Sequence, residues 1–241
     1  MGIQPEELHV ILENGAIELK GRFTRGFNYT FLVNVCHEGS EIPAVYKPGR
    51  GEQPLWDFPE NTLAGREVCA YQVSQALGFD LVPFTLLRDG PHGPGSLQEY
   101  IEHNPNYHYF TLNQADLERL RPVVLFDLLI NNADRKGSHI LVQKHTRKIY
   151  LIDHGLCFHA EDKLRTVVWD FAGEPIPEEL LLALSGFKTK LAQSGSLNEA
   201  LGQYLNPEEL DALRARAEVL LSSRQFPFPP EDRRAFPYPP L

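Results

Sequence analysis

The fold is decided by two short stretches of this chain, NADRKGSHILV at residues 132–142 and YLIDHG at residues 150–155. Each stretch joins an apolar run to an aspartate, Asp134 in the first and Asp153 in the second. The first supplies a candidate base with a cation, Arg135, beside it, and the second supplies a carboxylate for a metal ion. Phosphoryl transfer from ATP needs these groups, because that reaction depends on positioning and on neutralising charge.

The alternative for Asp134 is a turn without function, since Asp and Asn commonly close helices in turns. Asp153 argues against this alternative because it ends an apolar run, Lys148–Ile152. A carboxylate at the edge of a core is costly unless it binds a cation or a hydrogen-bond donor. A metal ion would compensate that cost, and Gly155 allows the backbone to turn directly afterwards.

The composition indicates a globular protein from a reducing compartment. The 241 residues, 42% of them hydrophobic, can bury a core in one large domain or in two packed lobes. A net charge of −9 argues against nucleic acid or an anionic membrane as the main partner. The three cysteines show no C-x-x-C spacing, which suggests neither disulfides nor a zinc site. With no secretion signal and no run long enough to span a bilayer, we expect a cytoplasmic protein without a stable membrane anchor.

The first third of the chain is predicted to be rich in β-structure. Within residues 29–35 the odd positions are all apolar, which favours a strand with one buried face. A loop rich in proline and glycine, residues 49–61, leads to a helix that Thr62 could cap and Gly78 should stop. The predicted elements are strands over 29–35 and 42–47, a helix over 62–77, and strands near 84–88 and 96–101.

The second half is predicted to be mainly helical. Pro122 should interrupt a helix over roughly 113–120 and start the next one. The tail, residues 226–241, is too rich in proline for regular structure, so it either lies extended over the body or is disordered. The remaining predicted elements are a helix over 123–131, short strands over 139–143 and 148–152, and helices near 178–193 and 207–223.

Residues of the first third complete a candidate nucleotide site. Lys47 ends a predicted strand and Glu67 lies on the following helix, and a strand lysine paired with a helix glutamate recurs in kinases, where it holds ATP phosphates. The alternative is a surface lysine unrelated to the glutamate. Gly26 lies in the stretch 21–30, which either folds over phosphates as a hairpin or is an ordinary turn.

Three neighbouring positions have open roles. Trp56 and Phe58, in the loop 49–61, are expected to be core anchors, because aromatic side chains usually pack. Their position would also let them shape a pocket. Arg66 either binds an anionic group of an acceptor or pairs with a carboxylate on the surface.

These motifs resemble those of a known kinase superfamily. Asp134-Arg135, a polar residue at the fifth place after the aspartate, and the later Ile-Asp-x-Gly resemble the catalytic and metal-binding motifs of phosphatidylinositol 3-/4-kinases. Val45-Tyr46-Lys47-Pro48 and Arg66-Glu67-x-x-Ala70-Tyr71 are most similar to type II phosphatidylinositol 4-kinases and to HipA-like kinases. The stretch YKPGRGEQPLWDFPENTLAGREVCAYQVSQALGFDLVP at residues 46–83 is also similar to a family of kinase-like actinobacterial proteins.

The resemblance spans roughly residues 8–225 and implies an α+β, bilobal, protein-kinase-like fold. Residues 1–225 would form a single kinase-like domain, followed by the tail. Its N-lobe, about 1–100, would be β-rich, and its C-lobe, about 101–225, would be mainly helical.

The resemblance also assigns roles to residues of this sequence. Lys47 would hold the ATP phosphates, with Glu67 as its ion-pair partner. Asp134, with Arg135 beside it, would orient or deprotonate the acceptor hydroxyl, and Asp153 would hold Mg²⁺ against the phosphates. The adenine would meet the hinge between the lobes, formed by Gln98, Glu99, Tyr100 and Ile101.

One position departs from the family pattern. The kinases place a metal-binding asparagine at the fifth position after the catalytic aspartate, and here that position is His139. Neutral histidine can ligate a metal, whereas Mg²⁺ prefers oxygen ligands. His139 is therefore a metal ligand that would favour Mn²⁺, a phosphate contact, or a structural residue.

We expect an ATP-dependent phosphotransferase that moves the γ-phosphate to a hydroxyl acceptor and uses ATP and Mg²⁺. The acceptor would be a small cytosolic compound or a protein, because the sequence has no basic amphipathic helix or lipidation motif that would favour a lipid. Two alternatives stay open. One is a catalytically silent nucleotide-binding regulator, suggested by His139, and the other is an enzyme that transfers AMP, since related folds can bind ATP reversed.

Overall fold

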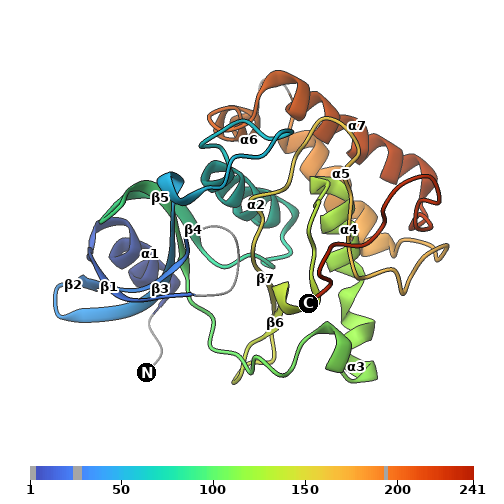
Figure 1. The fold of residues 1–241 in the computed structure, drawn as a ribbon. Coiled ribbons are helices and arrows are strands. Elements are labelled where there is room, and N and C mark those ends of the chain that lie inside the picture. Colours follow the sequence, from blue (N-terminus) through green and yellow to red (C-terminus); the bar gives the residue numbers. More distant parts are fainter. Residues whose placement is uncertain (1–3, 24–28, 193–194) are drawn as a thin grey trace.

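The computed structural model describes residues 4–23, 29–192 and 195–241, and these form two lobes (Figure 1). The smaller lobe is built on a five-stranded antiparallel sheet. The larger lobe is mainly helical and carries a two-stranded sheet on the side toward the smaller lobe. This arrangement agrees with the expected α+β, bilobal architecture.

The sheet of the smaller lobe has the strand order β1-β2-β3-β5-β4. Alternation along β2 and β3 buries Val33, Val35 and Ala44 in a core that Leu12 of α1 completes. The helix α1 was not predicted from the sequence. The elements of this lobe are α1 (Pro5–Asn14), β1 (Ala16–Arg22), β2 (Phe31–His37), β3 (Ser40–Pro48), the short 3-10 turn η1 (Gly49–Gly51), β4 (Thr85–Gly90) and β5 (Gly93–Glu99).

The helix α2 (Leu63–Leu77) follows the loop 49–61. Thr62 was expected to cap it, but the cap comes from the loop, where the Glu52 carboxylate accepts hydrogen bonds from the Leu63 and Ala64 N–H groups at 3.4 and 3.0 Å. An anion suits this end of a helix because the first N–H groups have no partner within the helix. Gly78 ends α2 in the left-handed conformation with φ 73°, as predicted.

α2 is anchored in the larger lobe. Its Cys69 and Val73 belong to the core of that lobe. Arg66 is buried and forms an ion pair with Glu209 of the helix α7 (Pro207–Ser223), with 2.6 Å between Nη2 and Oε1. Arg66 also donates to the Cys157 carbonyl at 2.7 Å. Of the two roles expected for Arg66, the structure shows pairing with a carboxylate, although the pair lies in the interior and not on the surface.

The larger lobe contains six further elements of regular structure and three short 3-10 turns in the described part of the chain. Pro122 lies in the first turn of α4, as predicted. α5 ends at Lys190, before the predicted end near residue 193, and the short helix α6 was not predicted from the sequence. The elements are η2 (Tyr109–Thr111), α3 (Gln114–Leu117), η3 (Glu118–Leu120), α4 (Arg121–Ile130), η4 (Gly137–His139), β6 (Ile140–Val142), β7 (Ile149–Leu151), α5 (Glu178–Lys190) and α6 (Ser196–Leu201).

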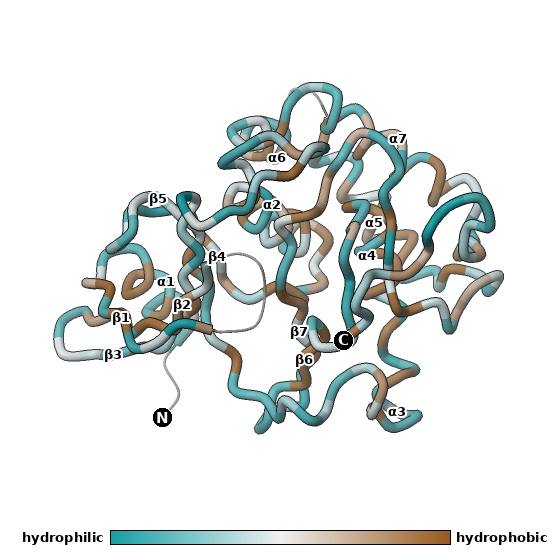
Figure 2. Tube along the Cα trace, viewed as in Figure 1, coloured by the Kyte–Doolittle hydropathy of each residue, from teal (hydrophilic) through white to brown (hydrophobic). Residues whose placement is uncertain are grey.

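The larger lobe holds the larger of two hydrophobic cores, and hydrophobic stretches mark α4, β6 and β7 in Figure 2. Phe126, Phe158 and Phe187, from three separate segments, are fully buried there. In β6 and β7, Ile140 pairs with Leu151, and both are buried. Among the described residues, no helix combines the length and the apolar character needed to cross a membrane.

The tail, residues 226–241, lies extended along the larger lobe, which is one of the two predicted outcomes. Phe226 is buried and exchanges backbone hydrogen bonds with Gly173 and Glu174. Further along, Arg233 donates to the Leu164 carbonyl at 2.8 Å. The chain ends beside η4 and β6 (Figure 1).

Candidate active site

The sequence-predicted site residues gather where the two lobes face each other. β3 and α2 contribute Lys47 and Glu67 from one side. The turn after α4 contributes Asp134, and the segment that follows β7 contributes Asp153, from the other side. All four side chains line one cleft, although Lys47 and Asp153 are 106 positions apart in sequence.

Lys47 is the centre of the charges in this cleft. Its ammonium group forms an ion pair with Glu67 and a second one with Asp153, where the Nζ–Oδ1 distance is 3.0 Å. Burial by itself would lower the pKa of Lys47, but the two carboxylates outweigh it and hold that pKa above its ordinary value. For Glu67, burial by itself would raise the pKa, but Lys47 and the His154 side chain lower it to about 2. The backbone N–H of His154 also donates to Glu67 Oε2 at 3.0 Å. The pair is therefore fully charged at neutral pH.

Asp153 occupies an unusual backbone conformation. Its φ is 65°, in the left-handed region that residues other than glycine rarely adopt, and its side chain is 51% exposed to the cleft. The positive charge of Lys47 holds the pKa of Asp153 well below its usual range, against the opposing effect of burial. Such strain commonly accompanies functional sites, and here it presents an anionic carboxylate to the cleft.

Asp134 is held by its own turn. Its N–H donates to Asn132 Oδ1 at 2.9 Å, and its carboxylate pairs with Lys136, with 3.0 Å between Oδ2 and Nζ. Burial raises the pKa of Asp134 to about 6, although Lys136 opposes the change. Lys136 was not singled out from the sequence, and its position two residues after the aspartate was the signal that could have found it.

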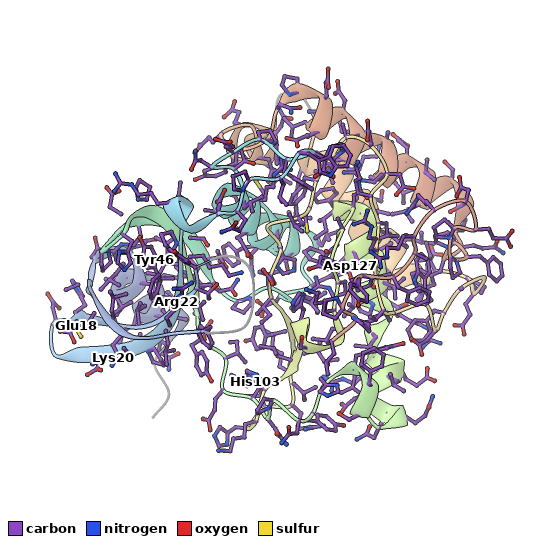
Figure 3. All side chains as sticks on the ribbon, viewed as in Figure 1. Glu18, Lys20, Arg22, Tyr46, His103 and Asp127 are labelled. Atoms are coloured by element: carbon purple, nitrogen blue, oxygen red, sulfur yellow. The ribbon has the colours of Figure 1, made fainter. Side chains whose placement is uncertain are left out.

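Arg135 lies in the core and not in the cleft. Its guanidinium is fully buried and binds the Asp127 carboxylate through Nε and Nη2 at 2.9 to 3.1 Å. It also donates to the Ile152 carbonyl at 2.9 Å. Figure 3 labels Asp127 within the larger lobe. The cation that was expected from Arg135 beside the catalytic base is supplied in the cleft by Lys136, whereas Arg135 supports the turn from behind.

His139 faces Asp153, with 3.3 Å between Nε2 and Oδ2. Burial lowers the pKa of His139 to about 4, so the ring is neutral at physiological pH. The Lys136 N–H points at Nδ1 at 3.5 Å, which assigns the ring proton to Nε2, the nitrogen that lies nearer to Asp153. Its predicted role as a metal ligand stays a prediction.

The hinge residues lie on the opposite wall of the cleft. Gln98 and Glu99 close β5, and Tyr100 and Ile101 follow it on the way to the larger lobe. Gln98 is buried and its amide donates to Thr85 Oγ1 at 2.8 Å, which fixes the wall. Gly26, predicted to fold over phosphates, lies outside the described residues.

Two adjoining pockets make up the cleft. The hinge-side pocket has a cavity volume of about 460 Å³, and the catalytic-side pocket has a cavity volume of about 410 Å³. Lys47 and Asp153 line both pockets, so their ion pair marks the border. The hinge-side pocket is lined further by Val45, Gln98, Glu99, Tyr100, Ile101, His103, Ser138 and His139. The catalytic-side pocket is lined further by Glu52, Leu55, Ala64, Glu67, Asp134, Lys136 and Leu156.

The loop 49–61 behaves only partly as expected. Phe58 is buried and packs against the Arg66 guanidinium, 4.9 Å from the ring centroid, as an anchor should. Trp56 is 90% exposed, which contradicts the expectation that it is a core residue. Lys163 lies over the indole ring at 4.8 Å and pairs with Asp57, so Trp56 is held by this contact and not by the core.

Residues 65–197, more than half of the chain, match the family model "Phosphatidylinositol 3- and 4-kinase". Along its length the chain is also similar to Protein Rv2133c of Mycobacterium tuberculosis. The two are 40% identical over 269 aligned residues, which cover 97% of this chain and 95% of that protein.

Solved structures with the same fold include three kinase-like proteins at low sequence identity. The Helicobacter pylori proinflammatory kinase CtkA superposes with a TM-score of 0.54 at 13% identity, covering 88% of this chain and 93% of that one. The Golgi casein kinase gives 0.53 at 14% identity, with coverages of 92% and 75%. Hydra Fam20 gives 0.55 at 13% identity, with coverages of 92% and 89%.

These structures confirm the predicted kinase-like bilobal fold, and the family match confirms the resemblance seen in the aspartate motifs. The matched segment contains Glu67, Asp134 and Asp153, three of the four charged residues that meet in the cleft. This chain belongs to the phosphatidylinositol 3- and 4-kinase family.

Proposed function

We propose that this protein transfers the γ-phosphate of ATP to a hydroxyl acceptor. The observation that carries the proposal is the meeting of Asp134, Asp153 and the Lys47–Glu67 ion pair in one cleft. Kinases of several classes use a lysine–glutamate pair for the phosphates, a carboxylate for the metal and a second one for the acceptor. The printed names of two structural neighbours, a proinflammatory kinase and a casein kinase, support the same class of reaction.

The two pockets suit the two reactants. The hinge-side pocket is lined by residues 98–101 together with the apolar Val45, Leu141 and Ile152, which fits an adenine, and its volume of about 460 Å³ suits a nucleotide. ATP bound there would carry its phosphates to Lys47 at the border. The catalytic-side pocket contains Asp134 and would receive the acceptor.

Asp134 is placed to take the proton of the acceptor hydroxyl. In the reaction, the acceptor oxygen forms a bond to the γ-phosphorus, the bond from that phosphorus to the β–γ bridging oxygen breaks, and ADP leaves. A pKa of about 6 leaves the Asp134 carboxylate ionised at neutral pH yet basic enough to accept a proton. Lys136 Nζ, 3.0 Å from the Asp134 carboxylate, would meet the charge of the phosphoryl group in transit.

The residues present fit a bound Mg²⁺ or Mn²⁺ in part. Within the described residues no group of three or more acidic, His or Cys side chains is arranged to hold a metal ion alone. Asp153 offers one anionic oxygen ligand that faces the cleft, and Mg²⁺ is commonly bound by one or two carboxylates together with substrate phosphates. When bound, the ion would neutralise charge on the phosphates. The His139 ring lies beside this carboxylate, with 3.3 Å between Nε2 and Oδ2.

A labelling experiment tests the proposal. The protein is incubated with ATP labelled at either the γ- or the α-phosphate, with Mg²⁺ or Mn²⁺ and a panel of hydroxyl compounds and peptides. Transfer of γ-label that is abolished in Asp134→Asn and Asp153→Asn, but kept in the exposed control Asp89→Asn, supports a kinase. Asp134→Asn should spare nucleotide binding, because that side chain lines only the catalytic-side pocket.

The same experiment separates the alternatives. Transfer of α-label would identify an enzyme that moves AMP. A rise in melting temperature with ATP and no transfer to any acceptor would favour the silent regulator, for which the engagement of His139 with Asp153 is the structural argument. An absence of nucleotide binding would refute the proposal. The cytoplasmic setting stays a prediction from the sequence.

A further inference from the structure

The tail lies against the two segments that flank Asp134. One is the turn that contains η4, and the other is the stretch 155–174 that follows Asp153. The Ala235 carbonyl accepts hydrogen bonds from the Thr166 N–H at 3.1 Å and from Trp169 Nε1 at 3.3 Å. The tail therefore binds the catalytic region through its backbone.

Residues 165–167 lie between the turn at Arg135, with which Thr166 forms a parallel β-bridge, and the tail, to which they donate one backbone hydrogen bond. On one side, the Arg135 N–H donates to the Arg165 carbonyl and the Val167 N–H donates to the Arg135 carbonyl, at 3.0 and 3.1 Å. On the other side, the intervening Thr166 N–H donates to Ala235. Because successive residues of an extended strand point their N–H groups to opposite sides, this second side is the free edge of the strand. The tail covers that edge.

The tail also reaches the catalytic turn itself. The Gly137 N–H donates to the Pro240 carbonyl at 2.8 Å. Gly137 directly follows Lys136, the partner of Asp134. On its other side, a Cβ placed at Gly137 would lie 2.8 Å from the Phe110 ring, so the turn is enclosed between the aromatic segment around η2 and the tail. The tail thus binds the turn that carries Asp134 and Lys136.

An extended polypeptide commonly binds a protein by adding a strand to an exposed edge. At the edge beside Asp134, the Thr166 N–H already donates to the carbonyl of Ala235, and Ala235 is buried. The side that stays open to Asp134 is the catalytic-side pocket, bounded by Leu55, Ala64 and Leu156. That volume accommodates a compact molecule.

We propose that residues 235–241 occupy the peptide-docking edge of the catalytic region and thereby limit the acceptor to small hydroxyl compounds. The inference rests on the proposed phosphotransferase activity and names the acceptor class. The tail acts as a ligand of its own chain, so acceptors reach Asp134 only through the catalytic-side pocket.

The experiment uses the full chain and a version that ends at Arg234, which keeps the buried Phe226. A fluorescent peptide with the sequence AFPYPPL should bind the shortened protein at least about tenfold more tightly than the full chain, whose edge is occupied. A peptide with Ala235→Asp should bind at least about tenfold more weakly, since it would bury a carboxylate. A peptide with Phe236→Ala should bind like the original, because Phe236 is half exposed. Circular dichroism and a melting curve establish that the shortened protein is folded.

Both proteins are then given γ-labelled ATP with a degenerate Ser/Thr/Tyr peptide library and, separately, a panel of sugars, inositols, amino alcohols and nucleosides. The full chain should label a panel compound, and its labelling of the library should rise at least about tenfold on removal of the tail. Equal labelling of the library by the two proteins overturns the inference, as does failure of AFPYPPL to bind the folded, shortened protein. If no label moves at all, the phosphotransferase proposal fails, while peptide binding still decides whether the tail occupies this edge.

Discussion

The buried pair of Asp127 and Arg135 offers the sharpest test of how the catalytic turn is supported. Both side chains are essentially inaccessible to solvent. Asp127 accepts from Nε and Nη2 of Arg135 and from Asn132 Nδ2 at 3.1 Å. Replacing Asp127 by alanine removes all of these bonds and leaves the guanidinium buried without a counter-charge. We therefore expect Asp127→Ala to weaken both the fold and the site.

Asp127→Ala should lower the free energy of unfolding by about 3–5 kcal/mol, because it removes one member of a buried ion pair. For chains of this size, 1 kcal/mol lowers the melting temperature by about 2–4 °C, so the expected drop is about 6–20 °C. Arg135 also bonds the Ile152 carbonyl, next to Asp153. Transfer activity should consequently fall even at temperatures where Asp127→Ala is still folded.

Urea unfolding of four proteins measures the effect: the original, Asp127→Ala, Arg135→Met and the double variant. In the double variant no charge is left unpaired, so it should be more stable than Asp127→Ala alone. A destabilisation below about 1 kcal/mol in Asp127→Ala would refute the reasoning, because a loss that small is typical of an exposed pair. If the double variant loses as much free energy of unfolding as the two single variants together, the coupling between Asp127 and Arg135 is refuted.

Three further predictions concern the cleft. Since Asp134 must be ionised to accept a proton and its pKa is about 6, kcat/KM should fall about tenfold per pH unit below that value. Lys136→Met should move this acidic limb of the pH–rate profile to higher pH. An unmoved limb would contradict the assignment. Lys47→Met should abolish the rise in melting temperature that ATP produces, because the phosphates lose their cation, and a retained shift would show that ATP binds elsewhere. Gly137→Ala should lower kcat, since its Cβ would meet an aromatic ring at 2.8 Å. The control Gly186→Ala, in open space on a helix, should leave kcat unchanged and add up to about 1 kcal/mol to the free energy of unfolding. Equal effects of the two variants on kcat would contradict the steric argument.

Local patterns predicted those parts of the fold that depend on local physics. The alternation in residues 29–35, the stop at Gly78 and the start at Pro122 each depend on a few neighbouring residues, and the structure contains each of them. The order of the charged motifs also indicated which side chains would meet in the cleft. Helix α1 was not predicted because its apolar residues are explained only by their packing against the sheet that it covers.

The remaining features depend on contacts between distant residues, which no local pattern contains. Glu52 replaces Thr62 as the cap of α2 because the loop folds back onto the helix. The Arg135 side chain points into the core because its counter-charge, Asp127 on the preceding helix, is buried there. The path of the tail depends on partners far away in sequence, among them the N–H groups of Gly137 and Thr166, which donate to the Pro240 and Ala235 carbonyls. The proline content of the tail excluded regular secondary structure, but the sequence did not show which residues the tail would contact.

The anchoring of α2 has a consequence for how the cleft opens. The helix that bears Glu67 is tied to the larger lobe by the Arg66–Glu209 pair and by Lys190, which donates to the Ala76 carbonyl at 2.7 Å. Lys47, in contrast, moves with the sheet of the smaller lobe. A rotation of that sheet away from the larger lobe would therefore pull Lys47 from Glu67, and the ion pair works as a latch between the two bodies. A nucleotide whose phosphates bind Lys47 while the lysine stays paired with Glu67 would then hold the sheet against the larger lobe.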